Sequence, residues 1–458
     1  MKISKYTLII IALWGCTFIS AQDQDSAVIK SLFEEALSSD IAYENLRYLC
    51  EQIGPRLCGS PQAAAAVAYT KQILENMGLD AVFLQNVEVP HWTDSGTEAG
   101  VTSRLCGTTK VNACALGLSV GTREAGIEAE VIEVKTFEDL DHLGANKIKE
   151  KIVFFNQPMD PKILNPLRAY SEVSKYRTQG AKKAASYGAV AAIVRSLTMT
   201  LDEFPHTGSM YYDPSLPKIP GAAIATQHAE LLSDWLVKDP QLKFHLKMKC
   251  RTLPNALSHN VIGQIIGSEF PDKIIAVGGH LDSWHLGPGA HDDGAGCMHA
   301  IEVLRLFKKL GIKPRHTLRA VLFMDEEINQ SGGREYARLA EKNKEKHLAA
   351  LESDGGADLP AGFSIDAADP VIAKIQSFRE LLIPYGLYHI EKGYGGVDIG
   401  PLKAQDVPLI GLKSNLQRYM EYHHSPKDSF DKINRRELQM GAASLASLVY
   451  LLDKHGLE

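Results

Sequence analysis

Apolar and polar positions alternate along this chain with two different periods, and the clearest pattern lies in its second half. Residues 273–277 form a short apolar stretch, KIIAV, with the length and branched side chains of a buried β-strand. Residues 295–310 carry apolar side chains at helical spacing, and Gly311 stands where such a helix would end. The Gly-rich turn between these segments carries His280, Asp282, Asp292 and Asp293. We expect these residues near the carboxyl end of the strand, where open α/β sheets place their catalytic and ligand-binding residues.

The alternation of strands and helices continues to the C-terminus. The pattern predicts strands at residues 318–323, 348–351 and 407–412, and helices at residues 334–340 and 437–452. Acidic residues or histidines follow the predicted strand ends in this part of the chain. The fold class that we predict is therefore α/β, with a mixed sheet flanked by helices.

The N-terminal part of the chain predicts helices followed by a strand. Residues 26–53 show helical spacing in two short pieces. Ser60 is suited to cap the next helix, with Pro61 as its first residue, and that helix is expected to end near residue 77. Residues 82–89 are predicted to form a strand.

A middle segment, residues 126–246, differs in character from the rest of the chain. It predicts strands at residues 129–134, 151–155, 189–194 and 217–224, and helices at residues 180–188 and 227–236. It contains no cluster of histidine and acidic residues. We therefore expect a small domain at 126–246, inserted between the first part (22–125) and the main part (247–458) of a larger domain that carries the chemistry.

Length and charge narrow the class of protein. A chain of 458 residues is too long for one ordinary core, which supports two domains. The net charge is −6 and no cluster of Lys and Arg is present, which argues against a nucleic-acid partner.

The N-terminus predicts export. Lys2 and Lys5 precede the apolar run 8–19, and Ala21 provides a small residue at a cleavage point, so residues 1–21 are expected to be a signal peptide. The apolar run is shorter than the ~20 residues that a membrane span requires, so we expect no stable membrane insertion. The protein would then be secreted or periplasmic. Lipid attachment at Cys16 is an alternative, although a Trp two residues before the cysteine fits a lipoprotein signal poorly.

Five clusters of acidic or histidine residues follow the predicted strands of the main part. They are His280 with Asp282, Asp292 with Asp293, residues 325–327 (DEE), residues 352–354 (ESD) and residues 422–425 (YHHS). Singly, each has an ordinary structural explanation, such as a helix cap or a solvated turn. Together, histidines and carboxylates at successive turns of one α/β region indicate a hydrolytic divalent-metal site, because structural zinc sites are rich in Cys.

The motifs that contain these clusters resemble those of the co-catalytic di-zinc aminopeptidase and carboxypeptidase family. In chain order they are GGHLDSW (278–284), GAHDDGAG (289–296), FMDEE (323–327), LESDGG (351–356) and YHHSPKD (422–428). The segments HTG (206–208) and KIPGAAI (218–224) resemble the protease-associated domain of that family, so the inserted segment 126–246 is expected to be such a domain.

The resemblance implies a role for each matching residue. Asp292 would bridge two zinc ions per chain, His280 and Asp354 would complete one ion, and Glu327 and His424 would complete the other. Glu326 would be the general base, and Asp282 would hold the imidazole of His280. His424 is chosen over His423 because it matches the family pattern that ends in Asp428. Asp398 also matches an acidic residue that the family has near its pocket.

The activity implied by the resemblance is that of a zinc metallo-exopeptidase. The substrates would be dipeptides or short peptides with a free N-terminus, and a homodimer is the expected assembly. Three alternatives remain open from the sequence. A glutaminyl-cyclase-like enzyme would hold one zinc ion, and an N-acyl amino acid deacylase would differ only in its pocket. A non-catalytic binding protein would have lost ligands, whereas here every matching residue is present.

Overall fold

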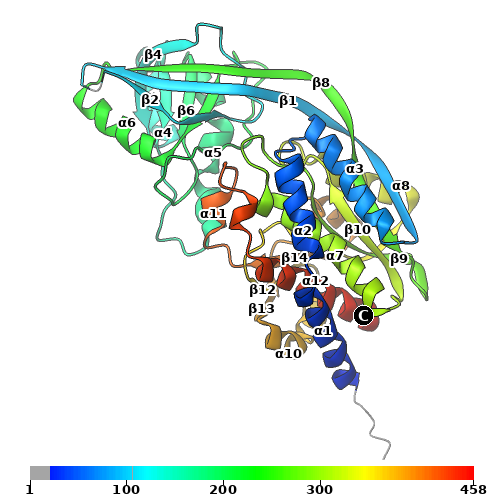
Figure 1. Cartoon of the computed structure of the whole chain (residues 1–458). Helices are drawn as coiled ribbons and strands as arrows, with labels where there is room; N and C mark the ends of the chain where they lie inside the picture. The colour runs from blue at the N-terminus through cyan, green and yellow to red at the C-terminus, as the bar shows by residue number, and fades with distance from the viewer. Residues whose placement is uncertain (1–20, 106, 458) are drawn as a thin grey trace, which may run out of the picture.

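A computed structural model describes residues 21–105 and 107–457 of the chain (Figure 1). The predicted signal peptide, residues 1–21, lies outside the described residues apart from Ala21. The molecule has two lobes: a large lobe, residues 21–103 and 243–457, and a small lobe, residues 107–242. Two long antiparallel strands, β1 (Ala81–Ser103) and β8 (Lys243–Ile265), run along both lobes and connect them (Figure 1).

The sheet of the large lobe places several carboxyl strand ends side by side. Its further strands are β9 (Phe270–His280), β10 (His316–Phe323), β11 (Lys346–Glu352), β12 (Pro360–Asp366), β13 (His389–Lys392) and β14 (Leu409–Ser414). The strand order is β13-β12-β14-β11-β9-β10-β8. Strand β9 is parallel to β10 and β11, and β11 is parallel to β14. The residues that follow these strands therefore meet at one edge of the sheet.

Helices cover both faces of this sheet. In chain order the helical elements of the large lobe are α1 (Ala21–Ser38), α2 (Ile41–Tyr48), η1 (Leu49–Ile53), α3 (Pro61–Asn76), η2 (Ala290–Gly294), α7 (Ala295–Leu310), α8 (Ser331–Asn343), α9 (Asp369–Gln376), α10 (Arg379–Leu382), η3 (Ile383–Tyr385), η4 (Gly400–Gln405), α11 (Tyr419–Tyr422), η5 (Phe430–Lys432) and α12 (Arg435–His455). Helix α7 is buried from Ala295 to Phe307, because it lies between the sheet and α12.

The period-two pattern of β9 separates two apolar cores. Ile275 and Val277 belong to the core that contains α7 and α12, whereas Ile274 and Ala276 belong to the core on the opposite face, which includes side chains of α8. A strand buried on both faces has a continuous apolar sequence, which is why KIIAV shows no polar alternation.

The small lobe is a second layered unit. Its elements are β2 (Gly107–Val111), β3 (Ala113–Ala115), β4 (Ile127–Val134), α4 (Phe137–Ile148), β5 (Ile152–Phe155), α5 (Pro166–Ala185), β6 (Ala191–Arg195), β7 (Gly221–Ile224) and α6 (Thr226–Lys238). Strands β4 to β7 are parallel in sequence order, and β4 pairs with β8 of the long strand pair. Strand β8 crosses the predicted domain boundary at residues 246/247 without a break, so the division into domains stays a prediction.

The structure confirms the predicted α/β class with a mixed sheet, and it extends two elements far beyond their predicted bounds. The strand predicted to end at residue 89 continues to Ser103, with a register shift between Val89 and His91 that accommodates Pro90. The helix predicted at residues 180–188 begins at Pro166, where Asn165 caps it.

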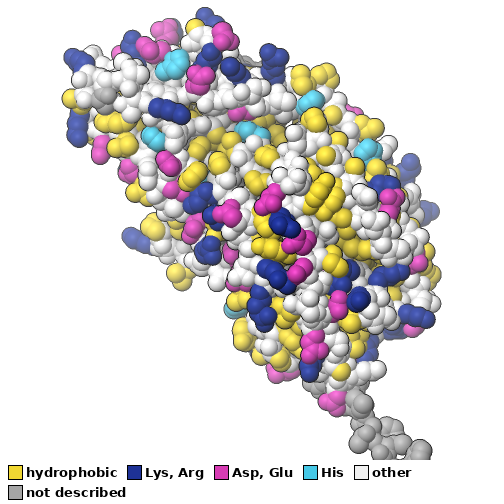
Figure 2. All heavy atoms as spheres, in the orientation of Figure 1, with side chains coloured by type: hydrophobic (Ala, Val, Ile, Leu, Met, Phe, Trp, Pro, Cys, Tyr) yellow, Lys and Arg dark blue, Asp and Glu magenta, His cyan; other side chains and the backbone are white. Residues whose placement is uncertain are grey.

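The surface shows no single dominant charge on the face drawn in Figure 2, where basic and acidic side chains are interspersed. Within residues 21–105 and 107–457, none of the helices combines the length and the apolar character that crossing a membrane requires.

Candidate metal centre

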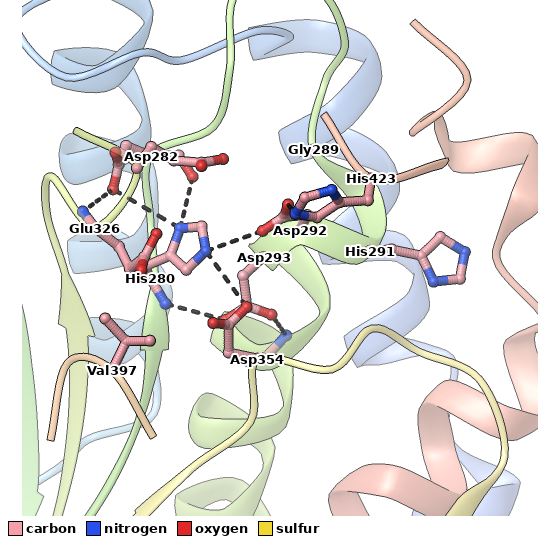
Figure 3. Close-up of polar contacts among 12 residues, drawn as sticks. His280, Asp282, Gly289, His291, Asp292, Asp293, Glu326, Asp354, Val397 and His423 are labelled. Atoms are coloured by element: carbon pink, nitrogen blue, oxygen red, sulfur yellow. Dashed lines mark hydrogen bonds and ion pairs between the residues drawn. The ribbon is translucent and has the colours of Figure 1, made fainter. Parts of the chain in front are cut away.

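Three adjacent strand ends bring most of the predicted site residues together. Strand β9 ends at His280, and its neighbours β10 and β11 lead into Glu326 and Asp354. Asp292 comes from η2, just before α7 begins. Figure 3 shows these side chains converging around the imidazole of His280.

The first donor group consists of His280, Asp292 and Asp354. His280 Nε2 lies 3.1 Å from Asp292 Oδ1 and 3.5 Å from Asp354 Oδ1. The other ring nitrogen, Nδ1, faces the backbone carbonyl of Asp282 at 3.1 Å. Because Nδ1 donates to that carbonyl, Nε2 is the nitrogen left with a lone pair for a ligand.

The second donor group consists of Asp292, Glu327 and His424. His424 Nε2 lies 3.1 Å from Glu327 Oε2 and 3.4 Å from Asp292 Oδ2. Asp292 therefore contributes one oxygen to each group. The neighbouring His423 is more distant, with its Nε2 at 3.8 Å from Asp292 Oδ2.

The spacing of these donors fits divalent metal ions. Zinc bonds of about 2.0–2.1 Å in a tetrahedral arrangement place neighbouring donor atoms roughly 3.3–3.4 Å apart. The four distances between 3.1 and 3.5 Å in the two groups are close to this value. Asp292 Oδ2 and Glu327 Oε1 are buried and accept no hydrogen bond from the residues that the structure describes. Such buried acceptors require a partner, and a metal ion would be one.

The electrostatics of the centre also favour a cation. Burial raises the pKa of Glu326, Glu327 and Asp354 above the usual values of carboxyl groups. The neighbouring carboxylate of Asp292 raises the pKa of all three further, and the His280 side chain, when it carries a proton in place of a metal, opposes this effect only in part. Several buried acids that repel one another are stabilised when divalent ions neutralise them.

Asp282 has a wider role than the one expected from the sequence. Its carboxylate lies 3.8 Å from His280 Nδ1, while its backbone carbonyl makes the shorter contact. Asp282 Oδ1 accepts the backbone N–H groups of Asp325 at 2.8 Å and Glu326 at 3.1 Å. The same residue thus positions the imidazole of His280 and the backbone that carries Glu326 (Figure 3).

Two further carboxylates hold the backbone of the centre. Asp293 accepts the N–H of His280 at 3.0 Å and that of Gly296 at 2.9 Å, which connects the end of β9 to the first turn of α7. A Cβ atom at Gly296 would lie 1.8 Å from a backbone oxygen, so only glycine permits this close approach. Asp428 accepts the N–H groups of His291 and Asp292 at 2.7 and 3.0 Å.

Asp398 is a buried acid beside the centre. Among the described residues, neither of its carboxylate oxygens has a hydrogen-bond partner. Its position is determined by Glu352, whose two oxygens accept the backbone N–H groups of Val397 and Ile399 at 2.7 and 2.9 Å. Burial, and then the neighbouring carboxylates of Glu352 and Glu326, raise the pKa of Asp398, so it lies near the site as predicted.

Arg56 supports the turn that leads to Asp292, and sequence analysis missed it. Its side chain is fully buried, and its guanidinium donates to the backbone carbonyls of Leu281, Pro288 and Gly289. These carbonyls belong to the segment that leads from His280 to Asp292. The sequence indicated only the helix start at Ser60 and Pro61 nearby, because the partners of Arg56 lie more than 200 residues away in the chain.

Replacing Arg56 by Met is expected to lower the free energy of unfolding by about 3 kcal/mol or more, since each of three buried carbonyls would lose a donor at ~1–3 kcal/mol. Thermal unfolding at fixed zinc concentration measures the effect. Arg47→Met is the matched control, because Arg47 is half-exposed and pairs with Glu44 one helical turn away. Equal melting temperatures for the two variants would contradict the role of Arg56.

A loop of the small lobe, residues 206–209, contacts the backbone of the second donor group. Thr207 N donates to His424 O at 2.9 Å, Ser209 Oγ donates to Glu327 O at 2.7 Å, and His206 Nδ1 lies 2.7 Å from His423 O. The sequence had indicated only that this segment resembles a family motif. The small lobe therefore helps to position Glu327 and His424.

A cavity of about 680 Å³ opens beside both donor groups. Its walls come from both lobes. The large lobe contributes Asp292, Glu326, Glu327, Asp354 and His424, and the small lobe contributes Tyr170, Arg177 and Tyr211. Cavities of roughly 300–1,000 Å³ accommodate small organic ligands. The site can thus hold a small substrate against its carboxylates and histidines.

Comparison with known proteins identifies the family. The family model for peptidase family M28 matches residues 260–449. Carboxypeptidase Q from Mus musculus is 35% identical over 413 residues, which cover 90% of this chain and 85% of that protein. The chain belongs to peptidase family M28. As an M28 peptidase it is an enzyme of the metallo-exopeptidase class, and the predicted family is confirmed.

Solved structures agree with this assignment. The crystal structure of a peptidase M28 precursor from Shewanella amazonensis is 32% identical, with a TM-score of 0.89 and coverage of 94% of this chain and 97% of that one. A zinc aminopeptidase from Bacillus subtilis is 22% identical, with a TM-score of 0.65 and coverage of 89% and 94%. This M28 peptidase shares its fold with that protein.

Proposed function

We propose that this M28 peptidase is a zinc-dependent exopeptidase that hydrolyses dipeptides or short peptides with a free N-terminus. The observation that carries the proposal is the position of Asp292, which contributes one oxygen to each of two donor groups beside Glu326. A carboxylate shared in this way is what a site for two ions requires.

Each ion would have its own ligands besides the shared one. His280 and Asp354 would hold one zinc ion, Glu327 and His424 the other, and Asp292 both. His424 is preferred to His423 because its Nε2 lies near both Asp292 and Glu327. Zinc held there supplies Lewis-acid polarisation of a substrate carbonyl and lowers the pKa of water.

Glu326 is the proposed general base. It lines the cavity, and the hydrogen bond from its backbone N–H to Asp282 determines its position. Its carboxylate takes a proton from the attacking water and later delivers it to the departing amine. Asp282 acts as a positioning residue, because it contacts His280 and the backbone of Glu326 rather than the cavity.

The preference for a free N-terminus rests on the family relationship rather than on the charge of the cavity. Four carboxylate residues line the cavity near the donor groups, namely Asp292, Glu326, Glu327 and Asp354, and two zinc ions would balance their charge. The proteins that share this fold include a zinc aminopeptidase, and enzymes of that kind act on peptides with a free N-terminus.

The remaining features of the proposal concern organisation. We propose that residues 126–246 are the protease-associated domain of the family. Within this segment, the loop 206–209 contacts the donor groups and helix α5 borders the cavity beside them. The enzyme would be exported through its N-terminal signal and would form a homodimer.

A substrate panel tests the proposed activity. Zinc-loaded enzyme is expected to cleave free dipeptides and to leave their N-acetylated forms intact, and treatment with a chelator should abolish cleavage until zinc is restored. Cleavage of the acetylated forms alone would indicate a deacylase. Cyclisation of N-terminal glutamine with one zinc ion per chain would indicate a glutaminyl-cyclase-like enzyme.

A further inference from the structure

Arg177 is a buried cation in the wall of the cavity. Arg177 lies on α5 of the small lobe and is 6% exposed, and its side chain borders the cavity. Its Nη1 donates to Thr207 O at 3.3 Å, and its guanidinium stacks over the ring of Tyr170 at 5.3 Å from the centroid. Its Nε is buried and has no hydrogen-bond partner within residues 21–105 and 107–457. Most of the five donors of this guanidinium are therefore not used by backbone acceptors.

Arg177 also differs from the other cations around the cavity. Lys392 forms an ion pair with Asp369 at 2.9 Å, and Lys413 pairs with Glu391. Arg177 has no carboxylate within ion-pair distance in the described part of the chain. A buried charge without a partner costs several kcal/mol, so an anion that enters the cavity would find a favourable site here.

The place of Arg177 relative to the reaction centre indicates which anion this is. Its Nη1 lies 3.5 Å from Nδ1 of His424, whose opposite nitrogen faces Asp292 and Glu327. The width of one imidazole ring thus separates the guanidinium from the second donor group. One extended residue spans about 3.3–3.6 Å, so a carboxylate one residue beyond the scissile bond would come within reach of Arg177.

The backbone is adapted to this guanidinium. A Cβ atom at Gly208 would lie 2.3 Å from Arg177 Cζ and Nη1, and Gly208 has a φ of +138°. The absence of a side chain at Gly208 lets the loop 206–209 pass directly against the guanidinium. This loop also contacts the backbone of His424 and Glu327, so Arg177 and the second donor group are held by the same segment.

We propose that Arg177 binds the C-terminal carboxylate of a dipeptide substrate and makes the enzyme selective for dipeptides over longer or amidated peptides. This inference rests on the proposed exopeptidase function. The guanidinium offers the planar pair of donors that a carboxylate accepts in a bidentate manner. A peptide carbonyl or a terminal amide at the same place carries no charge and would leave the buried cation unpaired.

The test compares a free dipeptide with its C-terminal amide, for example Ala-Leu and Ala-Leu-amide, with zinc-loaded wild type, Arg177→Met and Arg177→Lys. Wild type should prefer the free dipeptide by about 100-fold in kcat/KM, chiefly through KM. In Arg177→Met the dipeptide should lose most of this factor and the amide should be nearly unchanged. Arg177→Lys should be intermediate. Lys413→Met, a paired cation of the same cavity, should retain the wild-type preference.

A binding measurement separates this inference from the proposed function. Calorimetry with leucine and leucinamide on the zinc-loaded proteins should show tighter binding of leucine to wild type and no preference in Arg177→Met. This result would support the binding role of Arg177 even if no peptide were hydrolysed. A lack of hydrolysis would contradict only the proposed exopeptidase function. Equal hydrolysis of the dipeptide and its amide by wild type would overturn the inference and leave the function intact. An equal loss on both substrates in Arg177→Met, or equal binding of both ligands by wild type, would also overturn it.

Discussion

Replacing Glu326 by Gln is expected to lower kcat/KM for a free dipeptide by about 10²–10⁴-fold, because the amide cannot accept the proton of the attacking water. Glu326 belongs to neither donor group, so the zinc content should equal that of wild type. Glutamine has nearly the same shape, and the backbone N–H of residue 326 still donates to Asp282. Steady-state kinetics together with elemental analysis of zinc measure both parts of the prediction.

Glu391→Gln is the matched control for this experiment. Glu391 lines the same cavity and pairs with Lys413, but it belongs to neither donor group. The activity of the Glu391→Gln variant should stay close to that of wild type, since a half-exposed ion pair contributes ~0–1 kcal/mol to stability. An activity of Glu326→Gln within tenfold of wild type, or a loss of zinc in that variant, would show that Glu326 is not the base.

Replacing Asp292 by Asn should remove both zinc ions together. One carboxylate oxygen of Asp292 faces each donor group. The amide of an asparagine carries no negative charge, so both groups would attract zinc less strongly. Its NH₂ would also face one of the two groups in place of a ligand oxygen. Loss of groups that only support metal ligands already costs 10–100-fold in affinity or activity, so for a direct ligand we expect at least about 100-fold at each site. Activity should fall below detection at limiting zinc.

Asp354→Asn serves as the comparison that distinguishes a ligand shared by two ions from a ligand of one ion. Asp354 lies near His280 and belongs to the first donor group alone. After dialysis against limiting zinc, wild type should retain two ions per chain, Asp354→Asn one and Asp292→Asn close to none. Retention of one full equivalent by Asp292→Asn would mean that Asp292 serves only one ion.

The sequence predicted the elements whose apolar pattern is complete and local. Helix α7 begins at Ala295 and ends at Leu310, as its spacing and Gly311 indicated. Ser60 caps α3 through the N–H of Ala63, also as predicted. In both places short-range chemistry determines the boundary, so the residues next to it are sufficient to locate it.

Long or half-exposed elements were missed or predicted too short for a physical reason. Strand β8 was not predicted, because it carries exposed residues at 251–255, where it pairs with β1 between the two lobes, and these interrupt its apolar alternation. Helix α5 buries Ala169, Val173 and Tyr176 at helical spacing among polar neighbours, and this weak pattern was overlooked.

The site residues also divide into those that the local sequence reveals and those that it does not. The donors lie at strand ends and in short motifs, so their positions could be predicted from the sequence. Arg56, Arg177 and Ser209 contact the centre from segments more than 100 residues distant in the chain. Their local sequence shows only a turn, a polar helix and a loop. Such contacts become visible only once the two lobes and the strand pair that joins them are placed in space.

The most direct test of the two-ion centre is anomalous diffraction at the zinc absorption edge from crystals of zinc-loaded enzyme. The account predicts two peaks, one between Asp292, His280 and Asp354 and the other between Asp292, Glu327 and His424. A buried group formed by Cys58, Asp282 and Asp325 also holds three donor atoms within 4.8 Å of one another and provides a competing position. A single peak beside Asp292, or a peak at that competing group instead, would contradict the account.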